Sequence, residues 1–303
     1  MISVNYCRYV MGEYRKAASL GDEGVSRERI IQLLVHGAEG YFRSHEGLFE
    51  MACRAANSTL DASGVSRSRI NVVLLGSNSL RASAFEQDFG HRLISELGLC
   101  HAYVQQTGFQ NCADAVPILR TAKALIDSGA DEHVLVLIAD DIGAAGVPRI
   151  LKGSYLHSDG AAAALVTRQE HGFTLGLSKV VHAPGGGVSD VGPHDLAPHL
   201  PWLLNAALGV ARSFSRDSAQ PDFVITHNMN RLYHQMIANV FGVPVARVFS
   251  QPGLGHFLAA DVLVNMKDMV DQGTVRNGDE GLIIVPTNRS IGVMEVAYRS
   301  AHG

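Results

Sequence analysis

Residues 112–129 read CADAVPILRTAKALIDSG, and residues 256–273 read HFLAADVLVNMKDMVDQG. Each stretch begins with a side chain suited to acyl chemistry, Cys112 or His256, and has a glycine 17 positions later that can end a helix. An apolar run that predicts a strand follows each glycine, and another, NVVLLGSN or FVITHNMN, precedes each stretch. The shared layout predicts an internal repeat, a feature that determines the whole fold.

The repeat gives both reactive residues a special position. It predicts that Cys112 and His256 lie at the N-termini of two symmetry-related helices. Exposed N–H groups and the positive end of a helix dipole stabilise a thiolate and disfavour an imidazolium. We therefore expect a nucleophilic Cys112 and a neutral His256 that donates a hydrogen bond.

Apolar runs and amphipathic stretches alternate along the rest of the chain, which is typical of an α/β protein. The segment from His182 to Asp195 is glycine-rich and is predicted to be a long loop. Strands are predicted at residues 71–75, 102–105, 134–139, 161–167, 223–226, 281–285 and 292–298. Helices are predicted at residues 46–63, 89–97, 112–128, 197–215, 231–241 and 256–272.

The composition is that of an ordinary globular protein, with 47% hydrophobic and 18% charged residues among 303. The net charge of −4 contains no block of like charges, so neither nucleic acid nor a membrane is expected as a partner. No apolar run approaches the roughly 18 residues of a membrane span, and the start does not resemble a signal peptide. We expect a cytoplasmic protein. The four cysteines form no CxxC pair, and reduced thiols are expected.

Four stretches are informative through their order along the chain. They read GFQNCADAVPILRTAKALIDSG from Gly108, YLHSDGAAAALV from Tyr155, FVITHNMNRL from Phe223 and GLGHFLAAD from Gly253. In this order they resemble the nucleophile segment, the Asp–Gly–Ala turn, the histidine motif and the Gly–Asn segment of one enzyme family. That family is the β-ketoacyl-acyl-carrier-protein synthase III branch of the thiolase superfamily. The resemblance spans nearly the whole chain.

The resemblance implies a fold, a site and a reaction. The fold is the thiolase fold, five layers in the order αβαβα, built from two pseudo-symmetric halves at residues 1–170 and 171–303. The catalytic residues are Cys112 as nucleophile with His227 and His256 as its partners. The reaction is a condensation in which an acyl-Cys112 intermediate joins a malonyl-type thioester by decarboxylative Claisen chemistry.

One departure from the family keeps other reactions open. His256 stands where synthase III enzymes have asparagine, and the substitution is similar to the Cys–His–His set of elongating ketosynthases. Both residue types can donate a hydrogen bond to a thioester or enolate oxygen. Relatives with altered triads also form esters or amides, so transfer of the acyl group to an alcohol or amine is an alternative. A second alternative is a non-catalytic thiolase-fold subunit that shapes the pocket of an active partner.

Three more residues receive roles from the same resemblance. Asn230 either caps a helix or orients His227 or the substrate. Ser290 belongs to the stretch Asn288–Ser290, which replaces a glycine-rich loop of the family, and its backbone N–H is a candidate oxyanion donor. Phe85 aligns with a residue that reaches across the dimer into the partner's pocket, with core packing as the alternative.

The implied partners are an acyl thioester donor, an acceptor and a second copy of the chain. The donor is carried on an acyl carrier protein or on coenzyme A, and the family's coenzyme A clamp has no clear counterpart here. The acceptor is a malonyl-type thioester or a small nucleophile, and the assembly is a homodimer. No cofactor is expected. No metal is expected either, because the histidines form no ligand-spaced cluster in the sequence.

Overall fold

The computed structural model of this chain has ten strands in one continuous sheet. It describes residues 1–80, 87–108, 110–151, 155–183, 200–214, 220–287 and 289–301. In chain order the strands are β1 (Ile2–Met11), β4 (Val72–Gly76), β5 (Tyr103–Thr107), β6 (His133–Asp140), β9 (Gly160–Arg168), β10 (Gly172–His182), β11 (Phe223–Ile225), β12 (Val248–Phe249), β13 (Glu280–Pro286) and β14 (Ser290–Arg299). Across the sheet they follow the order β12-β11-β13-β14-β10-β1-β9-β6-β4-β5.

The first five and the last five strands are arranged alike. Numbered within its own set, each set runs third, second, fourth, fifth and first from the sheet edge to the middle. The second strand of each set pairs parallel with the third and fourth, and the other pairs are antiparallel. The sets meet where β1 and β10 pair over a short stretch. The predicted division at residue 170 falls between β9 and β10, and as a boundary between two halves it stays a prediction.

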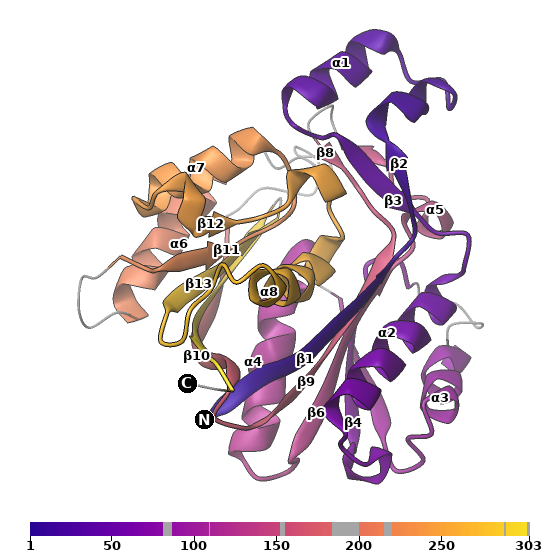
Figure 1. Cartoon of the computed structure of the whole chain (residues 1–303), viewed down its shortest axis with the longest axis vertical. Coiled ribbons are helices and arrows are strands. Elements are labelled where there is room, and N and C mark those ends of the chain that lie inside the picture. Colours follow the sequence, from indigo (N-terminus) through magenta and orange to yellow (C-terminus); the bar gives the residue numbers. More distant parts are fainter. Residues whose placement is uncertain are drawn as a thin grey trace.

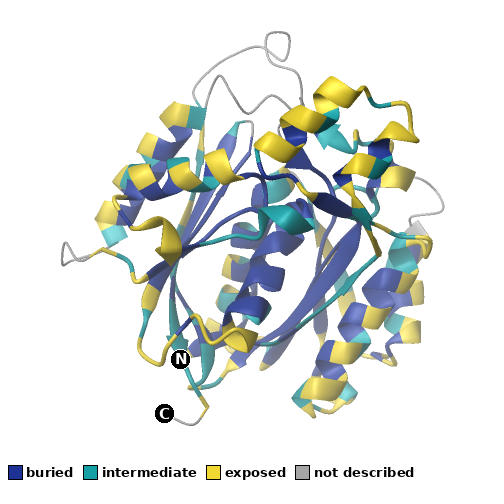
Figure 2. Cartoon of the chain, turned by 45° about the horizontal axis from the view of Figure 1, so that its top comes forward, coloured by how far each residue is buried: buried dark blue, intermediate teal, exposed yellow. Residues whose placement is uncertain are grey.

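Three buried clusters define the layers of the molecule. The main helices are α2 (Leu48–Ser63), α3 (Gln87–Glu96), α4 (Ala115–Asp127), α6 (Leu200–Phe214), α7 (Arg231–Phe241) and α8 (Asp261–Asp271). Helices α2 and α3 pack on the outer face of the first strand set, and α6 and α7 on that of the second. Helices α4 and α8 are buried between the two inner faces, as Figures 1 and 2 show. This arrangement confirms the predicted five-layered αβαβα fold.

The two helices of the middle layer begin later than predicted. Each is preceded by a 3-10 turn, η3 (Asn111–Asp114) before α4 and η6 (Leu258–Ala260) before α8. Asn111 and Leu258 have positive φ angles of 49° and 55°, which an α-helix does not contain. Cys112 and His256 therefore lie in the connections that lead into the helices.

Two long strands, β1 and β10, were not predicted, and both contain an irregularity. The register of β1 shifts between Asn5 and Arg8, and that of β10 shifts between Leu175 and Ser178. An extra residue in a strand reverses the facing of the side chains that follow, so the alternation of polar and apolar residues is lost. The sequence pattern consequently gave no strand signal there.

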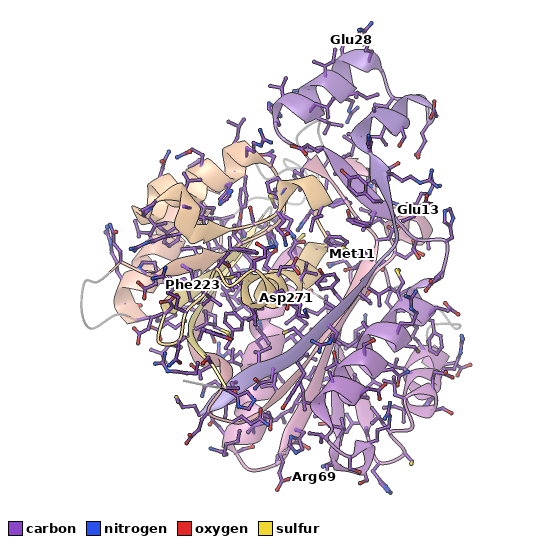
Figure 3. The ribbon with its side chains drawn as sticks, viewed as in Figure 1. Met11, Glu13, Glu28, Arg69, Phe223 and Asp271 are labelled. Carbon is purple, nitrogen blue, oxygen red and sulfur yellow. The ribbon has the colours of Figure 1, made fainter. Side chains whose placement is uncertain are left out.

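A small segment between β1 and α2 was also not predicted. It consists of η1 (Ala17–Gly21), α1 (Arg27–Val35) and the antiparallel pair β2 (Glu13–Lys16) and β3 (Gly40–Arg43), and it projects at the top of Figures 1 and 3. Only Leu33 of α1 is buried, so the apolar periodicity of this helix is weak. The remaining short elements are η2 (Arg67–Arg69), α5 (Ile142–Ala145), β7 (Ile150–Leu151), β8 (Tyr155–Leu156), η4 (Val245–Arg247) and η5 (Pro252–Leu254).

No helix in the described ranges has the length and apolar character needed to cross a membrane.

Candidate active site

The connections that lead into α4 and α8 bring Cys112 and His256 together. Sγ of Cys112 lies 3.2 Å from Nε2 of His256, although the two residues are 144 positions apart in the chain. Each connection contains a residue other than glycine in the left-handed conformation, Asn111 or Leu258. Such a conformation costs roughly 1–3 kcal/mol and is most often found at functional sites. The fold therefore holds a strained residue in each of the two turns that meet at Cys112.

The backbone of His256 is held on both sides by the segment after β8. Its N–H donates to the carbonyl of Leu156 at 2.7 Å, and its carbonyl accepts the N–H of Ser158 at 2.9 Å. Oγ of Ser158 donates to the carbonyl of Leu254 at 2.7 Å and accepts the N–H of Phe42 at 3.0 Å. These bonds fix the position from which the imidazole of His256 extends.

Asp261 is the first residue of α8, and its side chain is completely buried. Oδ1 accepts the N–H of Phe257 at 2.8 Å, and Oδ2 accepts the N–H of Asn228 at 2.8 Å. Oδ2 also accepts a hydrogen bond from Nδ1 of His256. Since Nδ1 faces the carboxylate, Nε2 is the nitrogen that faces Cys112. Cys112, His256 and Asp261 thus form a continuous chain of nucleophile, imidazole and carboxylate.

His227 follows β11 and approaches the same carboxylate. Its Nδ1 lies 3.5 Å from Oδ2 of Asp261, and its ring centroid lies 4.7 Å from that of His256. Within the described ranges, neither ring nitrogen of His227 has a hydrogen-bond partner of normal geometry. One carboxylate therefore lies beside both histidines, and His227 keeps ring nitrogens for a ligand. The structure brings together all three predicted catalytic residues.

The charges of the two histidines differ. Burial opposes a proton on His256, but the Asp261 carboxylate and the Cys112 sulfur outweigh it and raise the pKa of His256 to about 10. Burial lowers the pKa of His227 to about 4. For Asp261, burial favours the neutral acid, yet the two histidines hold its pKa well below its usual range. At neutral pH His256 is thus charged and His227 neutral.

The hydrogen bond to Asp261 favours the charged form of His256, whereas the sequence predicts a neutral His256. That prediction considered the helix dipole, which amounts to about half a charge at a helix end. A full negative charge on Asp261 in hydrogen-bond contact is the stronger influence. Asp261 itself was not predicted as a site residue, although it lies five positions after His256 in the quoted GLGHFLAAD stretch. An acid at that spacing was the signal that could have found it.

His227, His256 and Asp261 also form a compact set of metal-ligating groups, with one ligand atom from each within 4.8 Å of the others. The sequence showed no ligand-spaced histidines, and the fold supplies the proximity that the sequence lacks. Imidazole nitrogen and carboxylate oxygen are both zinc ligands. A metal bound through Nδ1 of His256 would have to replace the hydrogen bond that turns its Nε2 toward Cys112. The absence of a metal stays a prediction.

Two further residues beside His256 were not predicted. The ring centroids of Tyr155 and His157 each lie 5.6 Å from that of His256, and both side chains are buried. Nδ1 of His157 forms a 2.9 Å hydrogen bond with the carbonyl of Pro148. Burial, reinforced by Cys112, raises the pKa of Tyr155. Both residues precede the Asp–Gly–Ala turn in the YLHSDG stretch, and only the turn was interpreted from the sequence.

The three additional predicted residues have different outcomes. Oδ1 of Asn230 accepts the N–H of Tyr233 at 2.8 Å, so Asn230 caps α7, and its orienting role stays a prediction. The backbone N–H of Ser290 donates to Oγ1 of Thr287 at 2.9 Å, so this donor is already used within its own turn. Phe85 lies outside the described residues.

The internal repeat is present in the turns, but its residue correspondence was wrong. In both turns an aspartate follows the left-handed residue by three positions, Asp114 in one and Asp261 in the other. Matching these aspartates makes Ala259, and not His256, the counterpart of Cys112. The equal spacing to the two glycines arose because Gly273 follows Asp261 by 12 positions and Gly129 follows Asp114 by 15, which offsets the three positions between His256 and Ala259. The nucleophile and its base come from non-equivalent positions.

Comparison with known proteins finds similarity to one enzyme family. The family model described as 3-oxoacyl-[acyl-carrier-protein (ACP)] synthase III matches residues 109–183, which include Cys112 and the Asp–Gly–Ala turn. The β-ketoacyl-[acyl-carrier-protein] synthase III 3 of Streptomyces coelicolor is 26% identical over 57% of this chain and 60% of its own length. The β-ketoacyl-[acyl-carrier-protein] synthase III of Ruegeria sp. is 25% identical over 88% of this chain and 87% of its own. The first match thus spans less than two thirds of that relative.

Solved structures identify the fold. The 3-oxoacyl-[acyl-carrier-protein] synthase III of Aquifex aeolicus superimposes with a TM-score of 0.82 at 18% identity, covering 98% of this chain and all of its own. ChlB3, described as an acyltransferase, superimposes with a TM-score of 0.83 at 18% identity, covering 99% of this chain and 98% of its own. These structures show that the chain has the fold of the β-ketoacyl-acyl-carrier-protein synthase III enzymes, and the sequence matches show that it is similar to that family.

Proposed function

We propose that this protein is an acyltransferase that carries an acyl group on Cys112 and passes it to a hydroxyl or amino group. The observation behind the proposal is the chain from Cys112 Sγ through His256 to Asp261. A nucleophile, an imidazole base and a carboxylate that fixes the imidazole recur on unrelated folds that transfer acyl groups. Relatives of this fold include both synthases and an acyltransferase by description, so the fold alone does not decide between reactions.

The first half-reaction loads Cys112. The charged His256 beside Sγ stabilises a thiolate, which attacks the carbonyl carbon of an acyl thioester. A new carbon–sulfur bond forms, and the carbonyl oxygen becomes an oxyanion. When the tetrahedral intermediate collapses, the original carbon–sulfur bond breaks, and the departing thiolate takes the proton from Nε2 of His256. The products are acyl-Cys112, a free thiol and a neutral His256.

The second half-reaction uses the neutral imidazole as a base. Nε2 of His256 removes the proton of an incoming hydroxyl or amine as its oxygen or nitrogen attacks the acyl carbon. The carbon–sulfur bond to Cys112 breaks, and an ester or amide leaves. The Cys112 thiolate and the protonated His256 are restored together. Asp261 favours this step because its negative charge stabilises the imidazolium that forms.

Decarboxylative condensation is the second candidate, and His227 favours it. A malonyl-type thioester would lose carbon dioxide, and the electron pair of the broken carbon–carbon bond would form an enolate. The enolate would attack the carbonyl carbon of acyl-Cys112, and the Cys112 thiolate would be released. An enolate oxygen needs hydrogen-bond donors. His227 is buried, neutral and without a normal hydrogen-bond partner among the described residues, and its ring adjoins that of His256. The named function of both sequence relatives agrees with this alternative.

The partners follow from either reaction. The donor is an acyl thioester on an acyl carrier protein or on coenzyme A. We also propose a homodimer, because β5 ends the sheet with one side unpaired by any described strand and exposes Tyr103. Light scattering after size-exclusion chromatography should give twice the mass of the chain, and a monomer mass would contradict the dimer.

Intact-protein mass spectrometry tests the shared first step. Acetyl and butyryl thioesters of N-acetylcysteamine and of coenzyme A are incubated with the wild type and with Cys112→Ala. The wild type should gain one acyl group, and Cys112→Ala should gain none. No adduct on the wild type would reject the proposal in favour of a non-catalytic subunit, and an undiminished adduct on the variant would show that another residue carries the acyl group.

Product analysis distinguishes the second steps. Purified acyl-Cys112 enzyme is mixed with a malonyl thioester or with a set of small alcohols and amines. Ester or amide formation supports the leading proposal. A β-ketoacyl thioester with release of carbon dioxide supports condensation instead.

A further inference from the structure

A second group of polar side chains lies where the first strand set ends against α4. Ile138 of β6 packs in the core around α4, so Asp140, two residues further, points to the same face. Thr107 of β5 is in register with Gly76 of β4. Gly76 also faces α4, because a Cβ built there would lie 2.6 Å from Cδ1 of Ile118. The side chains of Thr107 and Asp140 therefore converge on the layer that α4 occupies.

Two more residues complete this group. Asp114 belongs to the turn that leads into α4, and its Oδ1 accepts the N–H of Gln110 at 3.1 Å. Asn78 follows β4, and its N–H donates to Oδ1 of Asp140 at 2.7 Å. We refer to Asn78, Thr107, Asp114 and Asp140 as the acceptor cluster.

Oxygen atoms of the acceptor cluster lack donors. Oδ1 of Asn78, Oγ1 of Thr107 and Oδ2 of Asp114 are shielded from solvent and have no hydrogen-bond partner in the ranges that the structure describes. Asp114 is buried, with only 1% of its surface exposed. A buried polar atom without a partner costs about 1–3 kcal/mol, and native proteins contain few of them. Three in one place point to a ligand that supplies donors.

The cluster also has unbalanced negative charge. Burial raises the pKa of both Asp114 and Asp140 to about 6, and the proximity of Asp140 adds to the effect at Asp114. Both groups therefore ionise near neutral pH. In the described ranges neither carboxyl group has an ion-pair partner, since the hydrogen bonds to them come from backbone and neutral side chains. A cation that also donates hydrogen bonds would satisfy the charge and the unpaired oxygens together.

We propose that the acceptor cluster binds the ammonium group of an aminoacyl chain carried on Cys112. An ammonium has three N–H donors and one positive charge, which suits three unpaired oxygens beside two carboxyl groups. Cys112 and Asp114 are two residues apart, so their Cα atoms are separated by at most about 7 Å and a short acyl chain can span the distance. The inference rests on the proposed function, because it requires an acyl-Cys112 intermediate.

The test uses two donors matched in size. The N-acetylcysteamine thioesters of 3-aminopropionate and butyrate differ by an ammonium in place of a methyl group. Mass spectrometry gives the rate constant of Cys112 acylation by each donor, and the ratio of the two rates is compared among variants. The wild type should prefer the aminoacyl donor by about tenfold or more, the effect of one hydrogen bond to a charged group. Asp114→Asn should lower this ratio about tenfold, and Thr107→Val should lower it by a smaller factor.

Asp127→Asn is the matched control, because it removes an exposed carboxylate at the other end of α4. It should retain the wild-type ratio. Circular dichroism checks that each variant is folded, and Thr107→Val provides the comparison if Asp114→Asn is not. A wild type without aminoacyl preference, or equal ratios in all variants, would overturn the inference while leaving acyl-Cys112 established. Failure of every donor to acylate Cys112 would overturn the proposed function as well.

A salt series covers the inorganic alternative. Sodium, potassium or magnesium chloride is added at constant ionic strength. If one of these ions accelerates acylation by both donors in the wild type but not in Asp114→Asn, the cluster is an inorganic cation site and the aminoacyl assignment is wrong. Rates independent of the ion, together with the expected donor preference, support it.

Discussion

The turns before α4 and α8 share a backbone conformation and differ in chemistry. In both, Oδ1 of the aspartate accepts the N–H four residues earlier, Gln110 for Asp114 at 3.1 Å and Phe257 for Asp261 at 2.8 Å. Oδ2 of Asp261 receives a hydrogen bond from His256, whereas Oδ2 of Asp114 has no partner in the described ranges. The pKa is accordingly lowered for Asp261 and raised for Asp114.

This comparison separates the turn from its function. The turn places a buried carboxylate at the start of each middle-layer helix, and side chains from other segments decide its charge and role. His256 and His227 adjoin the Asp261 carboxylate, whereas the hydrogen bond to Asp114 comes from the backbone N–H of Gln110. Variants of the two aspartates therefore test whether the two turns differ in function as well as in structure.

The largest effect is expected for Asp261→Asn. The variant keeps the shape of the side chain but removes the negative charge that stabilises the imidazolium of His256, so His256 becomes a weaker base for the incoming hydroxyl or amine. We expect single-turnover transfer from Cys112 at pH 7 to fall by about 10⁴-fold, the size of the loss when the carboxylate of such a triad becomes an amide. Rapid-quench measurement of acyl-Cys112 formation and decay gives both rates.

Asp268→Asn is the matched control for Asp261→Asn. Asp268 lies on the same helix, is nearly buried and accepts hydrogen bonds from Tyr9 and Gln251, away from both histidines. Its variant should transfer the acyl group within about threefold of the wild type, as expected for a site outside the reaction. Equal losses in the two variants would mean that Asp261 acts only in stability.

A smaller but more selective effect is expected for His256→Asn, which introduces the residue of the synthase III family. Asparagine can donate a hydrogen bond but cannot accept a proton, so transfer to an alcohol or amine should fall about 10²–10³-fold. Decarboxylation of a malonyl thioester should be less affected, because it requires donors and no base. Product rates with both acceptor classes check this. If both reactions were lost to the same extent, His256 would not be acting as a base in one reaction and only as a hydrogen-bond donor in the other.

Much of the fold could be predicted from the sequence, because regular elements leave regular patterns. The helix at Arg231–Phe241 was predicted with its observed bounds, where an Asn cap precedes it and Gly242 follows it. β1 and β10 were missed because bulges interrupt their alternation. The positive φ angles of Asn111 and Leu258 were equally hidden, since neither residue is a glycine.

The site was predictable where a residue type is chemically distinctive and not where proximity creates the function. Cys112, His227 and His256 were found from motifs, and the structure joins them. Asp261 and Asp114 were missed, because an aspartate in a helix start is ordinary and only the tertiary contacts give one of them two histidine neighbours. The charge of His256 could not be predicted for the same reason.

Asp114→Asn should make the protein more stable, whereas Asp261→Asn should lower its activity. Burial raises the pKa of Asp114 in the folded protein to about 6, above the usual value of an aspartate, so ionisation disfavours the folded state and stability falls as pH rises through this window. Asp114→Asn should therefore raise the free energy of unfolding by about 3 kcal/mol at pH 8 and by little at pH 4. Urea unfolding at both pH values measures it. An equal change at both would show that the charge of Asp114 is not the cause.

The smallest effect concerns how the two turns are held. The carbonyl and N–H of His256 bond to the segment around Ser158, whereas no crossing backbone bond to Cys112 is found in the described ranges. Ser158→Ala removes the hydroxyl that joins Phe42 and Leu254 and should cost about 2 kcal/mol of stability, the value of two hydrogen bonds. Because the anchor of His256 loosens, kcat should fall a few-fold with KM unchanged, and Ser158→Thr, which keeps the hydroxyl, should restore it. Loss of stability without any change in kcat would show that the position of His256 depends on Asp261 alone.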